Sequence, residues 1–72
     1  MRVLVADTHS EVRWALRTVI GEEPGLTLAG EVSDYVQLVQ QVRTLQPDVI
    51  VLEWELPDQP EGDLLAALGS TR

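Results

Sequence analysis

The sequence predicts an α/β fold in which a parallel three-stranded sheet of order 2-1-3 is flanked by helices. Short apolar runs at 3–6 and 49–52 have the composition of strands buried on both faces, and segments with the spacing of amphipathic helices lie between them. Strands that alternate with helices form parallel sheets with right-handed crossovers. A chain of 72 residues has room for one small domain.

The first strand and the first helix follow directly from the apolar pattern. Residues 3–6 form a continuous apolar run that Asp7 closes. A helix is predicted over 11–20, with Ser10 as its N-cap and Gly21 as its end. The apolar stripe of this helix consists of Val12, Ala15, Leu16, Val19 and Ile20.

The second strand rests on modest β propensity, whereas the second helix has a clear start and stop. We expect the strand over 26–30, after a turn at 22–25. Asp34, with Gln37 three residues later, forms a capping-box-like start, and Pro47 ends the helix. The apolar stripe consists of Tyr35, Leu38, Val39, Val42 and Leu45.

The last part of the chain is expected to add a strand, a loop and a short helix. The β-branched run at 49–52 reaches Glu53 and is typical of a strand buried on both faces. A loop is expected over 58–62. A helix of about two turns is expected over 63–68, before Gly69.

Composition excludes several classes of function. Twelve acidic residues against five basic ones give a net charge of −7, which repels phosphate backbones and anionic lipids, so we expect no direct nucleic-acid binding. Cysteine is absent, which excludes disulfides and thiolate metal sites. No stretch approaches the ~20 apolar residues that a membrane span needs. The sequence therefore predicts a cytoplasmic protein without a membrane partner.

Acidic side chains follow the first and third strands at one edge of the predicted sheet. In the order 2-1-3, the crevice beyond the carboxyl ends of these two strands is a topological switch point, where ligands bind. Asp7, Glu53 and Glu55 are therefore candidate ligands of Mg²⁺, a hard cation that takes oxygen donors. The alternative is that acidic residues at strand ends are merely solvated, and for Glu55 alone we favour that alternative.

Four segments, in order along the chain, carry a family resemblance. They are RVLVAD at 2–7, EVRWAL at 11–16, GEVSD at 30–34 and LQPDVIVL at 45–52. In these segments the chain resembles a bacterial response-regulator receiver domain, in particular the receivers of transcription regulators with a helix-turn-helix output. The resemblance covers nearly the whole chain. It implies a partial flavodoxin-like (receiver) fold, a role in two-component signal transduction, and a histidine kinase or another signalling protein as partner.

The resemblance also implies roles for individual residues. The family uses an acidic pair after the first strand and an aspartate after the third strand to hold Mg²⁺ and to accept a phosphoryl group. Asp7 matches the first acid of the pair, but Thr8 stands at the second position, which removes one anionic ligand and weakens Mg²⁺ binding. Glu53 stands at the phosphoacceptor position, where its extra methylene displaces the carboxylate and spoils in-line transfer. Glu55 would offer its backbone carbonyl to the metal.

The family's switch hydroxyl and phosphate-pairing lysine lie on later strands, and this sequence contains no lysine. We expect residues 1–72 to form a receiver-like domain that is truncated after its third strand and third helix. The third strand then has one open edge, and one of its faces lacks a helix. Two copies are therefore expected to associate through this edge, unless another chain or a longer protein supplies the cover.

Two classes of enzyme lack their signatures in this sequence. A phosphatase with an aspartyl nucleophile on a similar sheet requires a second aspartate two residues after the first, and His9 stands there. A nucleotide-binding enzyme requires a glycine-rich loop, which the segment 7–10 does not contain. The favoured hypothesis is a degenerate, non-catalytic receiver that acts by protein–protein interaction in a transcriptional response regulator. The alternative is a stand-alone dimerisation or docking module without a phosphorelay role.

The remaining conspicuous side chains have plainer interpretations. His9, two residues after Asp7, is a candidate metal ligand or phosphate carrier, but we favour a ring that faces solvent at the start of the first helix. Trp14 lies off the helical stripe, and Arg13 and Arg17 are expected to form a solvated face. The indole of Trp54 either shields the carboxylate pocket or packs beneath the third helix.

Overall fold

A computed structural model describes residues 1–53, 56 and 57 of the chain. Its elements are β1 (Arg2–Ala6), α1 (Ser10–Glu22), β2 (Thr27–Val32), α2 (Tyr35–Leu45) and β3 (Val49–Leu52). The three strands are parallel and lie in the order β2-β1-β3, which confirms the predicted α/β sheet. The loop and helix expected over 58–62 and 63–68 lie outside the described residues. No helix in the described part has the length and apolar character needed to cross a membrane.

The central strand β1 brings the carboxyl ends of all three strands together. Ala6 at its end pairs with Val32 of β2 on one side and with Leu52 of β3 on the other. Beyond this point the Asp7 amide donates to the Val32 carbonyl over 3.1 Å, and the Glu53 amide donates to the Ala6 carbonyl over 2.8 Å. The residues that follow β1 and β3 therefore start from neighbouring points.

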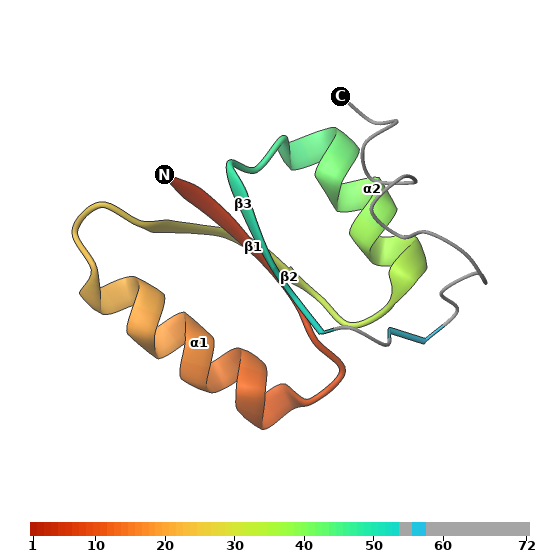
Figure 1. Ribbon diagram of the computed structural model, residues 1–72, viewed down its shortest axis with the longest axis horizontal. Helices are drawn as coiled ribbons and strands as arrows, with labels where there is room; N and C mark the ends of the chain where they lie inside the picture. Colours follow the sequence, from red (N-terminus) through yellow and green to blue (C-terminus); the bar gives the residue numbers. More distant parts are fainter. Residues whose placement is uncertain (54–55, 58–72) are drawn as a thin grey trace.

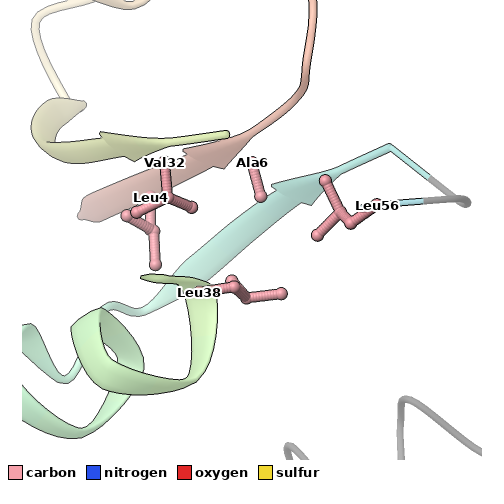
Figure 2. Packing of buried hydrophobic residues seen from close by; sticks show 5 residues of the cluster. All are labelled: Leu4, Ala6, Val32, Leu38 and Leu56. Atoms are coloured by element: carbon pink, nitrogen blue, oxygen red, sulfur yellow. The ribbon is translucent and has the colours of Figure 1, made fainter. Parts of the chain in front are cut away.

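Helices cover the two faces of the sheet, with α1 on one side and α2 on the other (Figure 1). On the α2 side, Figure 2 shows buried side chains that point toward one another: Leu4 and Ala6 of β1, Val32 of β2, Leu38 of α2, and Leu56 in the segment after β3. On the α1 side, the buried cluster consists of Val3, Val5 and Ile20. Since β1 contributes to both clusters, its predicted burial on both faces is confirmed.

The ends of α1 differ from those predicted, and the loop before it and the turn after it explain why. The N-cap is His9 rather than Ser10, because the Asp7 carboxylate accepts the His9 amide over 2.8 Å and holds that residue in an extended conformation. Gly21 does not end the helix, which continues for one more residue. Glu23 takes an extended conformation instead, as expected for a residue that precedes a proline such as Pro24.

Only two of the five residues in the predicted apolar stripe of α1 reach the core. Leu16 packs against the cluster that includes the buried Ile20. Val12 and Val19 are 38% and 56% exposed, respectively. The helix therefore rests on the sheet along a narrower line than its sequence pattern predicts.

Both ends of α2 form as the sequence predicts. The Asp34 carboxylate accepts the Gln37 amide over 2.8 Å, and the Gln37 side-chain oxygen accepts the Ser33 amide over 3.2 Å. This reciprocal arrangement resembles a capping box. It differs in that the Gln37 side chain bonds the amide of Ser33 rather than that of Asp34, the N-cap residue. At the other end, Gln46 adopts a left-handed conformation with φ of 47°, and Pro47 cannot continue the helix.

The second strand begins one residue later than predicted and continues two residues further, to Val32. The extension beyond 26–30 follows from pairing with the end of β1. Gly30 within it permits a close approach of α2, because a Cβ there would lie 2.9 Å from Leu45 Cδ1 and 3.4 Å from Leu4 Cδ1. Pairing with the central strand, rather than local propensity, therefore sets the limits of β2.

The third strand is not buried on both faces, contrary to the prediction. Ile50 and Leu52 pack against the core on the α2 side. Val49 and Val51, which pair with Val3 and Val5 of β1, are 37% and 38% exposed. The reason is that α1 packs over β1 and β2, so these two valines extend beyond the cover that the helix provides.

The role of α2 in the core can be tested with the substitution Leu38→Ala. Leu38 is fully buried, and truncation of a buried leucine costs about 2–5 kcal/mol of unfolding free energy through lost burial and a residual cavity. The matched control is Val36→Ala on the same helix, where the side chain is 51% exposed and the change should stay within about 0.5 kcal/mol. Urea unfolding followed by circular dichroism measures both. Equal losses for the two variants would contradict this packing.

Candidate functional site

The candidate site lies at the carboxyl ends of β1 and β3, as the sequence predicts. Asp7, Thr8 and His9 form the connection from β1 to α1, and Glu53 follows β3 directly. The hydrogen bond from the Glu53 amide to the end of β1 fixes the relative position of the two segments. Four polar side chains thus come from two strand ends that neighbour each other in the sheet.

Thr8 and Glu53 are joined by side-chain hydrogen bonds. The Thr8 amide and the Thr8 hydroxyl each donate to Glu53 Oε2 over 2.9 Å. The hydroxyl also lies 3.2 Å from Glu53 Oε1. Both oxygens of the carboxylate therefore have Thr8 as a partner, and one of them has two donors.

His9 lies between the two carboxylates of the site. Its Nδ1 is 3.0 Å from Asp7 Oδ1 and 3.6 Å from Glu53 Oε1. It also lies 3.2 Å from the Thr8 hydroxyl. The His9 side chain is 57% exposed, so the ring is open to solvent on one side, as expected, while its nitrogen faces the acidic groups.

The mutual arrangement of these groups shifts their acidities. Hydrogen bonds from the His9 amide and ring, together with the positive charge of that ring, hold the pKa of Asp7 below its ordinary value. In turn, the hydrogen bond to Asp7 and the negative charge of Glu53 raise the pKa of His9. The site therefore favours a protonated imidazole beside two carboxylates, which is an internal way to offset their repulsion.

Two arginines of α1 have specific partners, contrary to the expectation of a solvated face. Arg13 Nη1 donates to the Asp7 carbonyl over 2.6 Å and thereby braces the loop after β1. Arg17 forms a bidentate pair with Glu31 of β2 over 2.7 and 3.0 Å. This pair lowers the pKa of Glu31 and raises that of Arg17. The arginines hold α1 and the loop in place and lie outside the acidic cluster.

Asp7, His9 and Glu53 each offer one ligand atom within 4.8 Å of the others, which is compatible with a single metal ion. The structure thus brings together two of the three predicted metal-ligand positions, Asp7 and Glu53. Glu55, the third, and Trp54 lie outside the described residues. Thr8, expected at the second acid position, donates a hydrogen bond from its hydroxyl to Glu53.

His9 is the member of this cluster that the sequence analysis considered as a metal ligand and did not favour. The available signal was its place two residues after Asp7, in a loop where an aspartate commonly accepts the amide two residues on. That turn directs the ring back toward the acidic residues. At the N-cap position the ring of His9 stays largely exposed, as expected, while its Nδ1 faces Asp7 and Glu53.

The coupling between Asp7 and His9 can be tested with Asp7→Asn. This change replaces the charged Asp7 carboxylate, which forms a hydrogen bond with the His9 ring, by a neutral amide. It should therefore lower the pKa of His9, the single histidine of the chain. Because the folded-state pKa is raised, protonation of His9 stabilises the fold below the unfolded-state pKa, and this contribution is lost as pH rises through the folded pKa. Histidine C–H chemical shifts against pH report the change.

The matched control for this titration is Glu22→Gln, at the far end of α1, which should leave the His9 pKa unchanged. An unchanged His9 pKa in Asp7→Asn would show that the two side chains do not interact in solution.

Comparison with known proteins finds relatives that are protein-glutamate methylesterases, although no family model matches the chain. The protein-glutamate methylesterase/protein-glutamine glutaminase of Pyrococcus abyssi is 35% identical over 57 residues, which cover 79% of this chain and 16% of that protein. A protein of the same description from Anaeromyxobacter dehalogenans is 39% identical over 57 residues, with the same two shares of 79% and 16%. The chain therefore spans only a small part of the length of these relatives.

A solved structure matches the chain closely. The response regulator domain of Thermotoga maritima CheB superposes with a TM-score of 0.89 and 28% sequence identity, over 99% of this chain and 53% of that one. The matched domain has a receiver fold, which agrees with the strand order β2-β1-β3 and with the acidic site at the strand ends. Sequence and fold together show that the chain belongs to the receiver domains of response regulators.

Proposed function

We propose that this chain is a degenerate receiver module that is not phosphorylated at Glu53 and that acts through protein–protein contacts in two-component signalling. The observation that carries the proposal is the bonding of the Glu53 carboxylate. Both of its oxygens accept hydrogen bonds from Thr8. The group at the phosphoacceptor position is thereby tied to the residue that replaces the second acid of the family.

Phosphoryl transfer depends on the positioning of the attacking oxygen, and two features of Glu53 oppose it. The glutamate side chain is one methylene longer than the aspartate of the family, which moves its oxygens away from the usual place of attack. The hydrogen bonds from Thr8 then stabilise the carboxylate in its unreacted form. The module itself is therefore proposed to be non-catalytic.

The Mg²⁺ site of the family fits these residues poorly. Mg²⁺ takes near-octahedral oxygen ligands at about 2.0–2.1 Å and keeps several waters. Thr8 offers a neutral hydroxyl in place of a carboxylate and uses it on Glu53. In addition, the His9 nitrogen lies near both remaining carboxylates. Mg²⁺-dependent phosphoryl transfer is accordingly not part of the proposed function.

Because Glu53 is proposed not to be phosphorylated, its charge does not change with a signal, and the module is proposed to stay in one signalling state. A phosphorylated side chain carries about −1.5 to −2 charges, whereas Glu53 carries one, and part of that charge is offset by His9. Glu53 is therefore a partial substitute for the phosphorylated form at most. We propose that the surface recognised by partners does not switch with a phosphorelay.

The partner is proposed to be a histidine kinase or another signalling protein in the cytoplasm, with no contact to nucleic acid, which the net charge of −7 disfavours. The relatives are protein-glutamate methylesterases, which favours a methylesterase as the output joined to such a receiver, over the transcriptional output expected from the sequence.

A second role as a dimerisation or docking module is favoured by the exposed edge of the sheet. In the described part of the chain, β3 pairs on one side only, and Val49 and Val51 are exposed beside that edge. Such an edge is a template for another strand, and its apolar face gains from being covered. We propose that a second copy associates there.

The absence of phosphorylation can be tested with a small-molecule phosphodonor in the presence of Mg²⁺. Mass spectrometry should find no acyl phosphate on Glu53, whereas a receiver with intact acidic residues, treated in parallel, acquires one. The double substitution Thr8→Asp/Glu53→Asp restores the acidic residues of the family and should bind Mg²⁺ more tightly than the unchanged chain does. An acyl phosphate on Glu53 of the unchanged chain would contradict the proposed function.

Self-association can be tested with Val51→Lys. A lysine on this exposed position of the edge strand should weaken association by ~10-fold or more, with little loss of core packing. Val36→Lys, on a similarly exposed valine of α2, is the matched control and should leave association unchanged. Analytical ultracentrifugation over a range of concentrations measures both. A well-folded monomer at every concentration would rule out this mode of assembly.

A further inference from the structure

The acidic site contains a nitrogen donor that changes the kind of metal it suits. Asp7 Oδ1 and Glu53 Oε1 lie 3.0 and 3.6 Å from His9 Nδ1, and each of the three residues offers one ligand atom within 4.8 Å of those of the other two. We propose that these three residues bind a divalent transition-metal ion of the borderline class, such as Zn²⁺, in place of the Mg²⁺ of the family. The donor set is two carboxylates and one imidazole.

The spacing of the ligand atoms agrees with a tetrahedral ion. Zn²⁺ binds nitrogen and oxygen at about 2.0–2.1 Å, so neighbouring ligand atoms around a tetrahedron lie ~3.3–3.4 Å apart. The distances from His9 Nδ1 to Asp7 Oδ1 and to Glu53 Oε1 lie on either side of this value. Small rotations of these side chains are therefore enough to direct all three atoms at one point.

The charge of the site also agrees with a divalent ion. Asp7 and Glu53 bring two negative charges, which His9 offsets only when its ring is protonated. A bound Zn²⁺ neutralises both carboxylates and takes the lone pair of a neutral His9 Nδ1, so binding releases the proton that the ring held. Imidazole nitrogen is a preferred ligand of zinc, copper and nickel, whereas magnesium prefers oxygen.

Neighbouring groups already orient the ligands. Thr8 holds Glu53 Oε2 with two hydrogen bonds of 2.9 Å, which leaves Oε1 on the side of His9. The His9 amide holds Asp7 Oδ1, and Arg13 braces the Asp7 carbonyl. Metal ligands commonly depend on such outer hydrogen bonds. The threonine that weakens a magnesium site thus acts here as a positioning residue for Glu53.

The site is accessible to an ion from solvent. The side chains of His9, Glu53 and Asp7 are 57%, 24% and 16% exposed, respectively. With three protein ligands, a tetrahedral ion keeps one position for water or for a group from a partner protein. Formation of the site requires His9 Nδ1 to give up its contact with the Thr8 hydroxyl at 3.2 Å.

This inference rests on the proposed loss of the family's magnesium chemistry, but it is tested without any phosphodonor. The two tests are therefore separable: an acyl phosphate on Glu53 counts against the proposed function, and metal titration alone counts for or against the transition-metal site.

The experiment titrates the full 72-residue chain with ZnCl₂ and, separately, with MgCl₂ by isothermal calorimetry. We expect one Zn²⁺ per chain, bound more tightly than Mg²⁺ by more than ~10-fold. Co²⁺ is the spectroscopic probe, and it should give the intense visible absorption of a four-coordinate ion. Proton release, measured by repeating the zinc titration in buffers of different ionisation enthalpy, should accompany binding.

Three variants test the site: one removes a proposed ligand, one removes a positioning hydroxyl, and one is a control. His9→Gln removes the nitrogen donor and should weaken Zn²⁺ binding by ~100-fold or more, beyond the ~10–100-fold expected for a change in the outer shell. Thr8→Val should weaken Zn²⁺ binding by ~10–100-fold through loss of Glu53 orientation. Glu22→Gln, which removes a remote carboxylate of α1, is the matched control and should leave the affinity unchanged. Circular dichroism establishes that each variant is folded.

Three results would overturn the inference. The first is a chain that binds Mg²⁺ as tightly as Zn²⁺ or binds neither. The second is an unchanged Zn²⁺ affinity in folded His9→Gln. The third is a Co²⁺ spectrum with only the weak bands of a six-coordinate ion.

Discussion

The structure depends above all on the pairing of β1 with strands on both sides. This strand is buried on both faces, and its last residue, Ala6, pairs with β2 and β3 together. Because parallel strands end at the same edge, this pairing decides which residues meet there. Asp7 and Glu53 meet because their amides continue the two ladders by one hydrogen bond each. The site is therefore a direct consequence of the central part of the sheet.

The chemistry of the site follows from how its negative charge is offset. Receiver domains bind a cation with acidic residues, and among the described residues of this chain two carboxylates, those of Asp7 and Glu53, lie together at this edge beside Thr8. Thr8 brings a neutral side chain to the site, and its hydroxyl adds a hydrogen-bond donor to Glu53 beside the one that the backbone amide provides. His9, whose pKa is raised by Asp7 and Glu53, adds a positive charge when its ring is protonated. Hydrogen bonds and an imidazole thus perform within the chain part of what an ion performs in the family.

The sequence predicts those features that short segments determine. The cap of α2 forms from Asp34 and Gln37, three residues apart, and the strands at 2–6 and 49–52 follow from continuous apolar runs. The start of α1 and the limits of β2 were not predictable in this way. The first is set by a side chain of the preceding loop, and the second by pairing with another strand. The predicted strand order was enough to place Asp7 beside Glu53. The orientation of His9 depends on the turn at Asp7, and the spacing of apolar residues along the sequence carries no information about that turn.

The exposed valines of β3 affect the stability of this chain but not the geometry of its site. Val49 and Val51 lie on the α1 side, where the helix covers β1 and β2, and their exposure lowers the free energy gained by burying the sheet. The site, in contrast, is built at the carboxyl end of β3, and the hydrogen bond from the Glu53 amide to the Ala6 carbonyl of β1 fixes that end. A cover over the valines would therefore strengthen the fold without moving Glu53. For this reason the arrangement of Asp7, Thr8, His9 and Glu53 is a property of the two paired strands and of the loop after β1, whatever covers the face beside them.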